Sequence, residues 1–264
     1  MLTAAKNQLK VILLSVKYNI MREMTNRFTF LTNVIFMVLN NASFIVQWLV
    51  LFHLKKGIGG YELNDIMILW GLAASSYGLS HILFQQAYQL PGLIMNGKLD
   101  SFLVQPKNVL LSIISSRTNS SAFGDLVYGY LILFIFRFSL PNLLLFTYFS
   151  ITGALIITAF AVITGSLSFW IIRGDIIAEN LSNLMINFSI YPEAIFKGVV
   201  RLLLYTVIPV GFVAFLPLKV ILHFNLFHLF TVTGVAAFMI LLAFTIFYRG
   251  LKRYTSSNLM SARI

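Results

Sequence analysis

The stretch FTFLTNVIFMVLNNASFIVQWLVLFHL, residues 28–54, decides the fold class, because it contains no charged side chain between Arg27 and Lys55. A helix needs about 20 mostly apolar residues to cross the hydrocarbon core of a bilayer. Three further long uncharged stretches are residues 66–97, 138–172 and 220–248. The sequence therefore predicts an all-α integral membrane protein.

The composition of the whole chain agrees with this prediction. The 264 residues are 59% hydrophobic and 10% charged, with a mean hydropathy of +0.88, whereas soluble domains carry about 25% charged residues. The absence of cysteine excludes disulfides and thiolate metal sites. We assign the net charge of +11 to Lys and Arg retained on the cytoplasmic side of a membrane. We therefore expect contact with lipid and none with nucleic acid.

Six spans account for the pattern of apolar stretches and breaks. The run 138–172 is longer than one span requires, and Pro141-Asn142 supplies a turn, so two helices there form a hairpin. We expect one transmembrane domain, residues 27–264, with spans at about 28–53, 64–90, 121–139, 143–172, 175–191 and 226–249.

The first 26 residues predict a separate helix at the membrane surface. Lys6, Lys10 and Lys17 fall on one side of a helix, and no compact apolar core is followed by a cleavage site. Such a basic amphipathic helix lies among anionic headgroups. The alternative is a simple extension of the first span.

The distribution of basic residues predicts that both termini are cytoplasmic. With six spans, 13 Lys and Arg then lie on the cytoplasmic side and 6 on the outer side. Lys197 and Arg201 do not fit this arrangement well. An alternative places residues 174–201 in the cytoplasm and makes 202–218 the fifth span.

Several polar side chains fall inside predicted spans, where they mark substrate pathways or contacts between helices. Those on the first span share one face of the helix, and the others lie in the second and fifth spans. For the histidine, a hydrogen bond to a neighbouring helix is an equal alternative. We hypothesise that a translocation route is lined by Asn40, Ser43, Gln47, His81 and Asn187.

The region that follows residue 172 is polar for a span and rich in proline. Asp175 and Glu179 are one helical turn apart, so at membrane depth they must face protein or water. Broken backbone at that depth is tolerated only inside protein or along a wet cavity. We therefore predict a re-entrant outer element at 193–217, with its breaks marked by Tyr191, Pro192, Pro209 and Pro217.

Residues 92–99, GLIMNGKL, nearly match a nucleotide-binding loop, but Leu99 stands where that loop needs a hydroxyl for Mg²⁺. His223 and His228 have no acidic partner in a catalytic pattern. We therefore expect no catalytic residue, no metal site and no cofactor bound by this chain.

Taken in order, these elements resemble a known family. The segment GKLDSFLVQP, residues 97–106, is similar to the pattern G-x-[LI]-[DE]-x-x-L-x-x-P, and FGDLVYG (123–129), SIYP (189–192) and VIP (207–209) follow at matching places. The chain resembles the membrane permeases of type-2 ABC exporters that are encoded apart from their ATPase. The resemblance covers essentially the whole chain.

The resemblance implies a bacterial plasma-membrane exporter subunit that works as a dimer, with a second copy or a paralogue, and with cytoplasmic ABC ATPase subunits that bind ATP and Mg²⁺. Within residues 91–119 it implies a coupling segment that contacts the ATPase, formed by Gly97, Lys98, Leu99, Asp100, Ser101, Phe102, Leu103 and Pro106. The alternative is an ion-coupled secondary transporter or a channel, although no internal repeat is visible.

Overall fold

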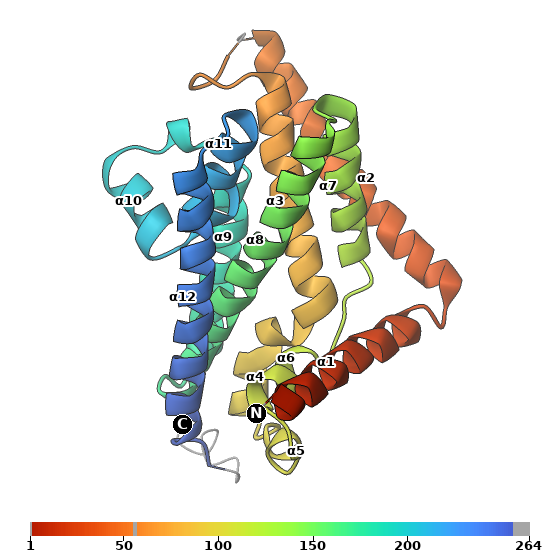
Figure 1. Cartoon of the computed structure of the whole chain (residues 1–264), viewed down its shortest axis with the longest axis vertical. Helices are drawn as coiled ribbons and strands as arrows, with labels where there is room; N and C mark the ends of the chain where they lie inside the picture. Colours follow the sequence, from red (N-terminus) through yellow and green to blue (C-terminus); the bar gives the residue numbers. More distant parts are fainter. Residues whose placement is uncertain (1, 55–56, 256–264) are drawn as a thin grey trace.

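The computed structural model describes residues 2–54 and 57–255, and it is a helical bundle (Figure 1). Helices make up 81% of the chain, and the described residues contain no strand. The elements in chain order are α1 (Leu2–Glu23), α2 (Arg27–Leu54), α3 (Leu63–Phe84), η1 (Gln85–Gln89), α4 (Leu90–Met95), α5 (Asp100–Leu103), α6 (Val109–Ile114), α7 (Ala122–Phe136), α8 (Leu140–Ser166), η2 (Leu167–Phe169), α9 (Gly174–Ser189), η3 (Glu193–Ile195), α10 (Gly198–Thr206), the π-helix η4 (Gly211–Phe215), α11 (Leu216–Leu222) and α12 (Leu226–Leu251).

Four helices in the described chain are long and apolar enough to cross a membrane: Arg27–Leu54, Leu63–Met95, Leu140–Phe169 and Leu226–Leu251. A fifth span is present if the bent pair formed by α10 and the helix from η4 to α11 is counted as one. The predicted third span is the shorter apolar helix α7 of 15 residues, and the predicted fifth is the 16-residue helix α9. Membrane-crossing length is thus present for four of the six predicted spans.

Helix α3 lies at the centre of the bundle, where other helices bury most of its small and apolar residues. Ile66, Ile68 and Leu72 are fully buried, and α3 packs most extensively against α7 and α8. A Cβ atom added to Gly78 would lie 2.8 Å from the backbone nitrogen of Leu126 in α7. A small residue at this position therefore allows the backbones of α3 and α7 to approach closely.

Two prolines lie inside first turns of helices rather than in loops. The sequence predicted a turn at Pro141-Asn142, but α8 begins at Leu140, where the Ser139 hydroxyl accepts a hydrogen bond from the Asn142 backbone at 3.2 Å. Pro91 likewise lies in the first turn of α4. The predicted turn at Pro141-Asn142 was wrong because the first turn of a helix does not need the N–H group that proline lacks.

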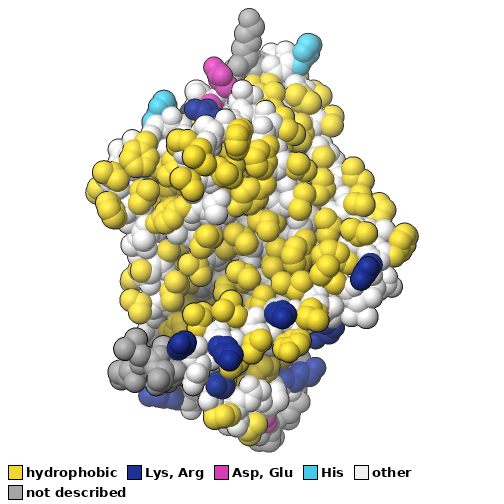
Figure 2. Space-filling view, turned by 45° about the vertical axis from the view of Figure 1, so that its right-hand side comes forward, with side chains coloured by type: hydrophobic (Ala, Val, Ile, Leu, Met, Phe, Trp, Pro, Cys, Tyr) yellow, Lys and Arg dark blue, Asp and Glu magenta, His cyan; other side chains and the backbone are white. Residues whose placement is uncertain are grey.

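The bundle has two different ends. One end holds α1, α5 and the C-terminal part of α12, and the opposite end holds the loop 57–62 and α11 (Figure 1). Most Lys and Arg side chains seen in Figure 2 lie in the lower half of the molecule, toward the first of these ends. We call it the basic end.

The helices α2 and α12 form much of the outer surface. Large apolar side chains such as Phe36 and Leu39 on α2, and Phe238 and Leu241 on α12, are exposed. Exposure of this extent along helices of 26 to 28 residues fits contact with lipid hydrocarbon or with another protein chain.

The segment between α9 and α12 is interrupted at residues 190–192, where Tyr191 and Pro192 lie, at 196–197, and again at 207–209. The pair α10 and α11 bends by 80° at residues 207–210, where Pro209 lies. Pro217, expected to be a second break, instead lies in the first turn of α11, directly after η4, and the helix continues to Leu222. The predicted break at Pro209 is therefore present, and the predicted break at Pro217 is absent.

Candidate functional site

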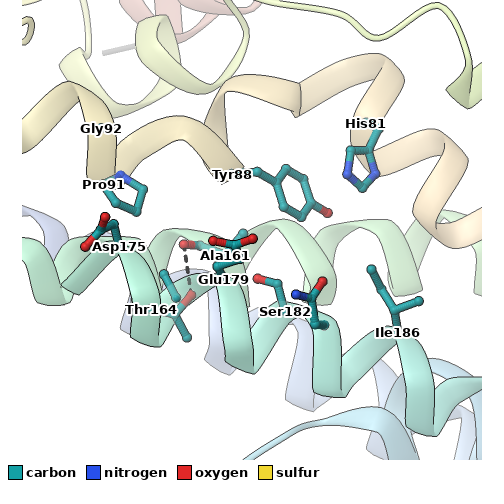
Figure 3. A pocket seen from close by; sticks show the side chains of 12 residues that line it. His81, Tyr88, Pro91, Gly92, Ala161, Thr164, Asp175, Glu179, Ser182 and Ile186 are labelled. Carbon is teal, nitrogen blue, oxygen red and sulfur yellow. Dashed lines mark hydrogen bonds between the residues drawn. The ribbon is translucent and has the colours of Figure 1, made fainter. Parts of the chain in front are cut away.

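A cavity of about 340 Å³, with both polar and apolar lining, lies between the α3–α4 region and α9. Figure 3 shows the side chains of His81 and Tyr88 on one wall and those of Asp175, Glu179 and Ser182 on the facing wall, which is α9. The remaining lining residues are Pro91, Gly92, Ala161, Thr164, Ala178, Asn183 and Ile186. This cavity lies toward the basic end of the bundle, because α4, which contributes to its lining, belongs to that end (Figure 1).

A second cavity of about 300 Å³ adjoins the first and shares His81 and Ile186 with it. It lies between α2, α3 and α9 and is lined in addition by Met37, Asn40, Asn41, Phe44, Trp70, Ala73, Ala74, Tyr77, Asp125, Asn187 and Ile190. The two cavities together are called the groove below. The groove runs from Gly92 on α4 along one side of α3 as far as Trp70.

His81 is held rigidly at the junction of the two cavities. Its Nδ1 atom donates a hydrogen bond to the carbonyl oxygen of Tyr77 at 2.9 Å, and its ring stacks on Tyr88 with 4.1 Å between centroids. The Tyr88 hydroxyl in turn lies 2.8 Å from the Ser80 hydroxyl, which is 2.7 Å from that of Thr158 in α8. The side chain of His81 therefore lines both cavities, and its hydrogen bond stays within α3 instead of reaching a neighbouring helix as the alternative expected.

Three carboxyl groups line the groove. Asp125, in the first turn of α7, accepts a hydrogen bond of 2.6 Å from the side-chain amide of Asn41. Asp175 and Glu179 on α9 belong to none of the ion pairs found in the described residues. The Asp175 Oδ1 atom is inaccessible to solvent and has no hydrogen-bond partner in that part of the chain. The groove is thus acidic, and its described lining contains no Lys or Arg.

The structure brings together three of the five residues predicted to line a route. Asn40, His81 and Asn187 all line the second cavity, although they come from three different helices. Ser43 and Gln47 lie outside it, on the exposed face of α2, and the Ser43 hydroxyl donates to the Asn40 carbonyl oxygen at 2.6 Å.

Sequence reasoning missed two members of the groove. Asn41 was passed over because the helical spacing joined Asn40 to Ser43, yet Asn41 is the buried residue that binds Asp125. Tyr88 was not considered, because only tertiary packing places its ring on His81.

The segment predicted to couple to an ATPase forms the tip of the basic end. Gly97 adopts a φ of 65°, which allows the sharp turn into α5. Leu99 is fully buried in the core cluster beneath it, and Phe102 packs against the same cluster. The residues that face outward are Lys98, Ser101, Leu103, Val104, Gln105 and Pro106. Val104 is 83% exposed. The inner face of the segment therefore packs against the core, and its outer face is exposed.

Helix α1 is hydrogen-bonded to the residues that follow this segment, from Asn108 to Ser115. The side chains of Ser15 and Asn19 both donate to the carbonyl oxygen of Ser115, at 2.8 and 3.0 Å. The Gln8 side chain accepts a hydrogen bond from the backbone of Asn108 at 3.0 Å. A displacement of the segment after α5 would therefore be transmitted to α1.

The C-terminal end of α12 also contacts the segment. Burial, together with the nearby negative charge of Asp100, raises the pKa of Tyr254 to about 12. Tyr254 also packs against the core cluster that holds Leu99. Asp100 is thus directed toward the C-terminal region.

The opposite end contains a buried charged cluster around Glu193. Arg201 lies 2.6 Å from its Oε1 atom, the Tyr205 hydroxyl donates to Oε1 at 2.9 Å, and Lys219 pairs with Oε2. Burial tends to raise the pKa of Glu193, but the hydrogen bonds from Lys219 and Tyr205 and the two positive charges lower it below its usual value. Arg201, which fitted poorly with the predicted orientation, therefore has a local acidic partner.

The loop before α3 closes over this cluster. Gly59 has a φ of 61°, and a Cβ atom there would collide with the Cβ of Ala194. Trp48 meets Tyr191 edge to face, with 6.1 Å between ring centroids. Burial and the neighbouring charge of Glu193 raise the pKa of Tyr61 in the same loop. Arg137 pairs with Asp65 at 3.2 Å nearby on α3. This end of the bundle is closed.

The described residues contain no group of three or more metal-ligating side chains close enough to hold a metal ion. The stretch that resembles a nucleotide-binding loop, residues 92–99, forms the end of α4 and the turn after it, with α3 and η1 before it. It therefore lacks the strand that such a loop requires.

No curated protein and no solved structure matches the chain. The family described as ABC-2 family transporter protein matches residues 37–258, which extend from α2 to the residues after α12. Its members are membrane permeases, transport subunits that generally work with ATPase subunits and are not themselves catalytic. Because the match covers most of the length and the fold supplies long apolar helices around a polar groove, this multi-pass membrane protein belongs to the ABC-2 family of transporters.

Proposed function

We propose that the chain is the permease subunit of an ABC exporter in a bacterial plasma membrane, with both termini cytoplasmic. Two copies, or one copy and a paralogue, form the translocation route, and separate ATPase subunits bind ATP and Mg²⁺ and supply the energy. The basic end is then the cytoplasmic end, in agreement with the excess of Lys and Arg there.

The observation that carries this proposal is the two-sided build of the segment 97–106. Its inner side chains, Leu99 and Phe102, are rooted in the core cluster that also contains Ile94 and Leu90, close to the groove. Its outer side chains are free to contact a partner. A force applied to the outer face therefore reaches the helices around the groove through packed side chains, as coupling between two rigid bodies requires.

The transport step follows from the difference between the two ends. The groove is hollow next to the basic end, while the Glu193 cluster and the loop over it close the opposite end. This arrangement suits a conformation that receives cargo from the cytoplasm. ATP-driven closure of the ATPases would push the segment 97–106 and shift the bundle toward an outward-open state.

The exposed polar face of α2 supports assembly as a dimer. Asn40 lines the groove, while Ser43 and Gln47 continue the same face of α2 beyond it. Polar side chains exposed at membrane depth are unfavourable against lipid and favourable against another protein or water. We place the second permease against this face.

The test begins with the contact to the ATPase. The tagged chain is expressed with the other genes of its operon and purified in detergent, and an ABC ATPase should co-purify. Val104→Asp adds a charge to the exposed outer face of the segment and should abolish co-purification. Thr25→Asp, which adds the same charge at the exposed α1–α2 junction, should leave it intact. Loss of the ATPase from both variants, or from neither, contradicts the proposed contact.

A second test separates ATP-driven transport from ion-coupled transport. In proteoliposomes with the ATPase, Asp100→Lys combined with Phe102→Ala should leave ATP hydrolysis running without transport. The permease alone should accumulate no cargo under an ion gradient. Accumulation driven by the gradient would instead identify a secondary transporter.

A further inference from the structure

The groove has an unusual charge for a chain this basic. Only 8 acidic side chains accompany 19 Lys and Arg, yet three of those acidic side chains line the two cavities, and no Lys or Arg from the described chain does. The carboxyl groups at the two ends behave differently: Glu193, Asp65 and Glu23 each pair with a cation. The groove therefore carries negative charge that the described chain leaves uncompensated.

Two of these carboxyl groups lie on one wall. Asp175 and Glu179 are one turn apart on α9 and both line the first cavity, with Asp175 across from Pro91 and Glu179 nearer to Tyr88 (Figure 3). No ion pair in the described chain involves either of them.

The facing wall offers aromatic surface. The rings of His81 and Tyr88 stack on each other on the wall that faces α9, and Trp70, Phe44 and Tyr77 continue the aromatic lining into the second cavity. Aromatic faces attract organic cations through the negative potential of the ring face. Cavities of 300–340 Å³ lie in the range of drug-sized ligands.

We propose that the groove is a binding site for an organic cation that also carries apolar rings or chains. The positive charge lies beside Glu179 and Asp175, and the apolar part lies against the His81–Tyr88 stack. This inference rests on the proposed transport function and adds its substrate class. Anionic cargo is disfavoured, because it would meet three carboxyl groups and no described cation in the groove.

The test measures binding without any ATPase, so its result does not depend on coupling. The purified chain is placed in nanodiscs of phosphatidylcholine, and binding of radiolabelled tetraphenylphosphonium is measured against empty nanodiscs. Tetraphenylborate, which has the same shape and the opposite charge, serves as the competitor. We expect saturable binding of the cation and no competition by the anion.

Variants then locate the bound cation. Glu179→Gln should weaken tetraphenylphosphonium binding about tenfold, as expected for loss of one partly desolvated charge contact. Glu23→Gln, which makes the same change at the half-buried C-terminal end of α1, should bind like the unmodified chain. If Glu179→Gln does not fold, Ser182→Lys on the same wall decides, because a fixed positive charge there should abolish binding.

The proposal is overturned if no saturable binding is found, if the anion competes equally, or if Glu179→Gln and Ser182→Lys both bind with unchanged affinity. Such a result together with a co-purifying ATPase would leave the permease function standing and remove only the substrate class. Tight cation binding without any co-purifying ATPase would instead support the binding site and remove the proposed ATP-driven permease function.

Discussion

Glu193 and Glu179 lie only 14 positions apart in the sequence, but the bundle gives them opposite surroundings: one has cationic partners and the other has none among the described residues. Glu193 is buried at the closed end and is surrounded by Arg201, Lys219 and Tyr205. Glu179 lines a hollow groove and has no ion pair in the described structure. A buried carboxylate with its cations present serves the fold, whereas one that faces a cavity without them is available to a ligand.

The largest expected effect is on the closed end. Glu193→Gln removes a buried charge and leaves Arg201 and Lys219 without their partner, so it should lower the free energy of unfolding by about 3 kcal/mol. Thermal unfolding in detergent, followed by size-exclusion fluorescence, measures this change. An unfolding temperature equal to that of the unmodified protein would remove the structural role from this cluster.

The stabilities of the unmodified protein and of Glu193→Gln should also depend differently on pH. Because the pKa of Glu193 is lowered in the folded chain, its stabilising contribution is complete above the ordinary glutamate pKa and is lost as the pH falls through the lowered value. The difference in unfolding temperature between the unmodified protein and Glu193→Gln should therefore shrink in strongly acidic buffer. A difference that stays constant down to that range would contradict the assigned charge.

The next largest effect concerns the loop that closes over this end. Gly59→Ala must place a side chain at positive φ and against the Cβ of Ala194, and it should destabilise the protein by about 2 kcal/mol. Gly60→Ala is the matched control, because Gly60 also has positive φ but meets no atom within 4 Å. The difference in unfolding temperature between the two variants isolates the contact. Equal values would show that the loop does not press on the Glu193 turn.

A smaller effect is expected inside the groove. Asn41→Ala removes the amide that donates to Asp125 across the α2–α7 contact, and it should cost about 1 kcal/mol. Asn40→Ala, the neighbouring change at an exposed position, provides the comparison in the same unfolding assay. The ranking would be reversed if Asn40 rather than Asn41 held the two helices together.

The smallest effect completes the comparison. Glu179→Gln should change the free energy of unfolding by less than about 0.5 kcal/mol, because no ion pair in the described chain is broken. Unfolding temperature is again the measurement. A loss as large as that of Glu193→Gln would mean that the groove carboxyl group supports the fold.

Particular helices show how far the sequence could lead. The uncharged stretch 28–54 predicted α2 to within one residue at each end, because hydrophobic length is a local property. The prolines were harder to interpret, since Pro91, Pro141 and Pro217 each occupy a first turn that the residue type alone does not reveal. Pro209, in contrast, lies at an 80° bend as its sequence context predicted.

The candidate site divides in the same way. The polarity of Asp175 and Glu179 at a predicted membrane depth already required them to face protein or water. Their position opposite the His81–Tyr88 stack could not be predicted, because it depends on the packing of α9 beside α3 and α4. The segment 97–106 was recognised by its residues, while the hydrogen bonds of Ser15 and Asn19 to Ser115, which follows it in the chain, depend on where α1 lies.

The sequence by itself determined that the chain is a membrane protein, that polar groups lie inside its spans, and which family it resembles. These properties follow from the order and type of neighbouring residues. Only the tertiary structure decided that one glutamate is neutralised at a closed end while another remains open to a cavity, because charge compensation depends on side chains brought together from distant helices.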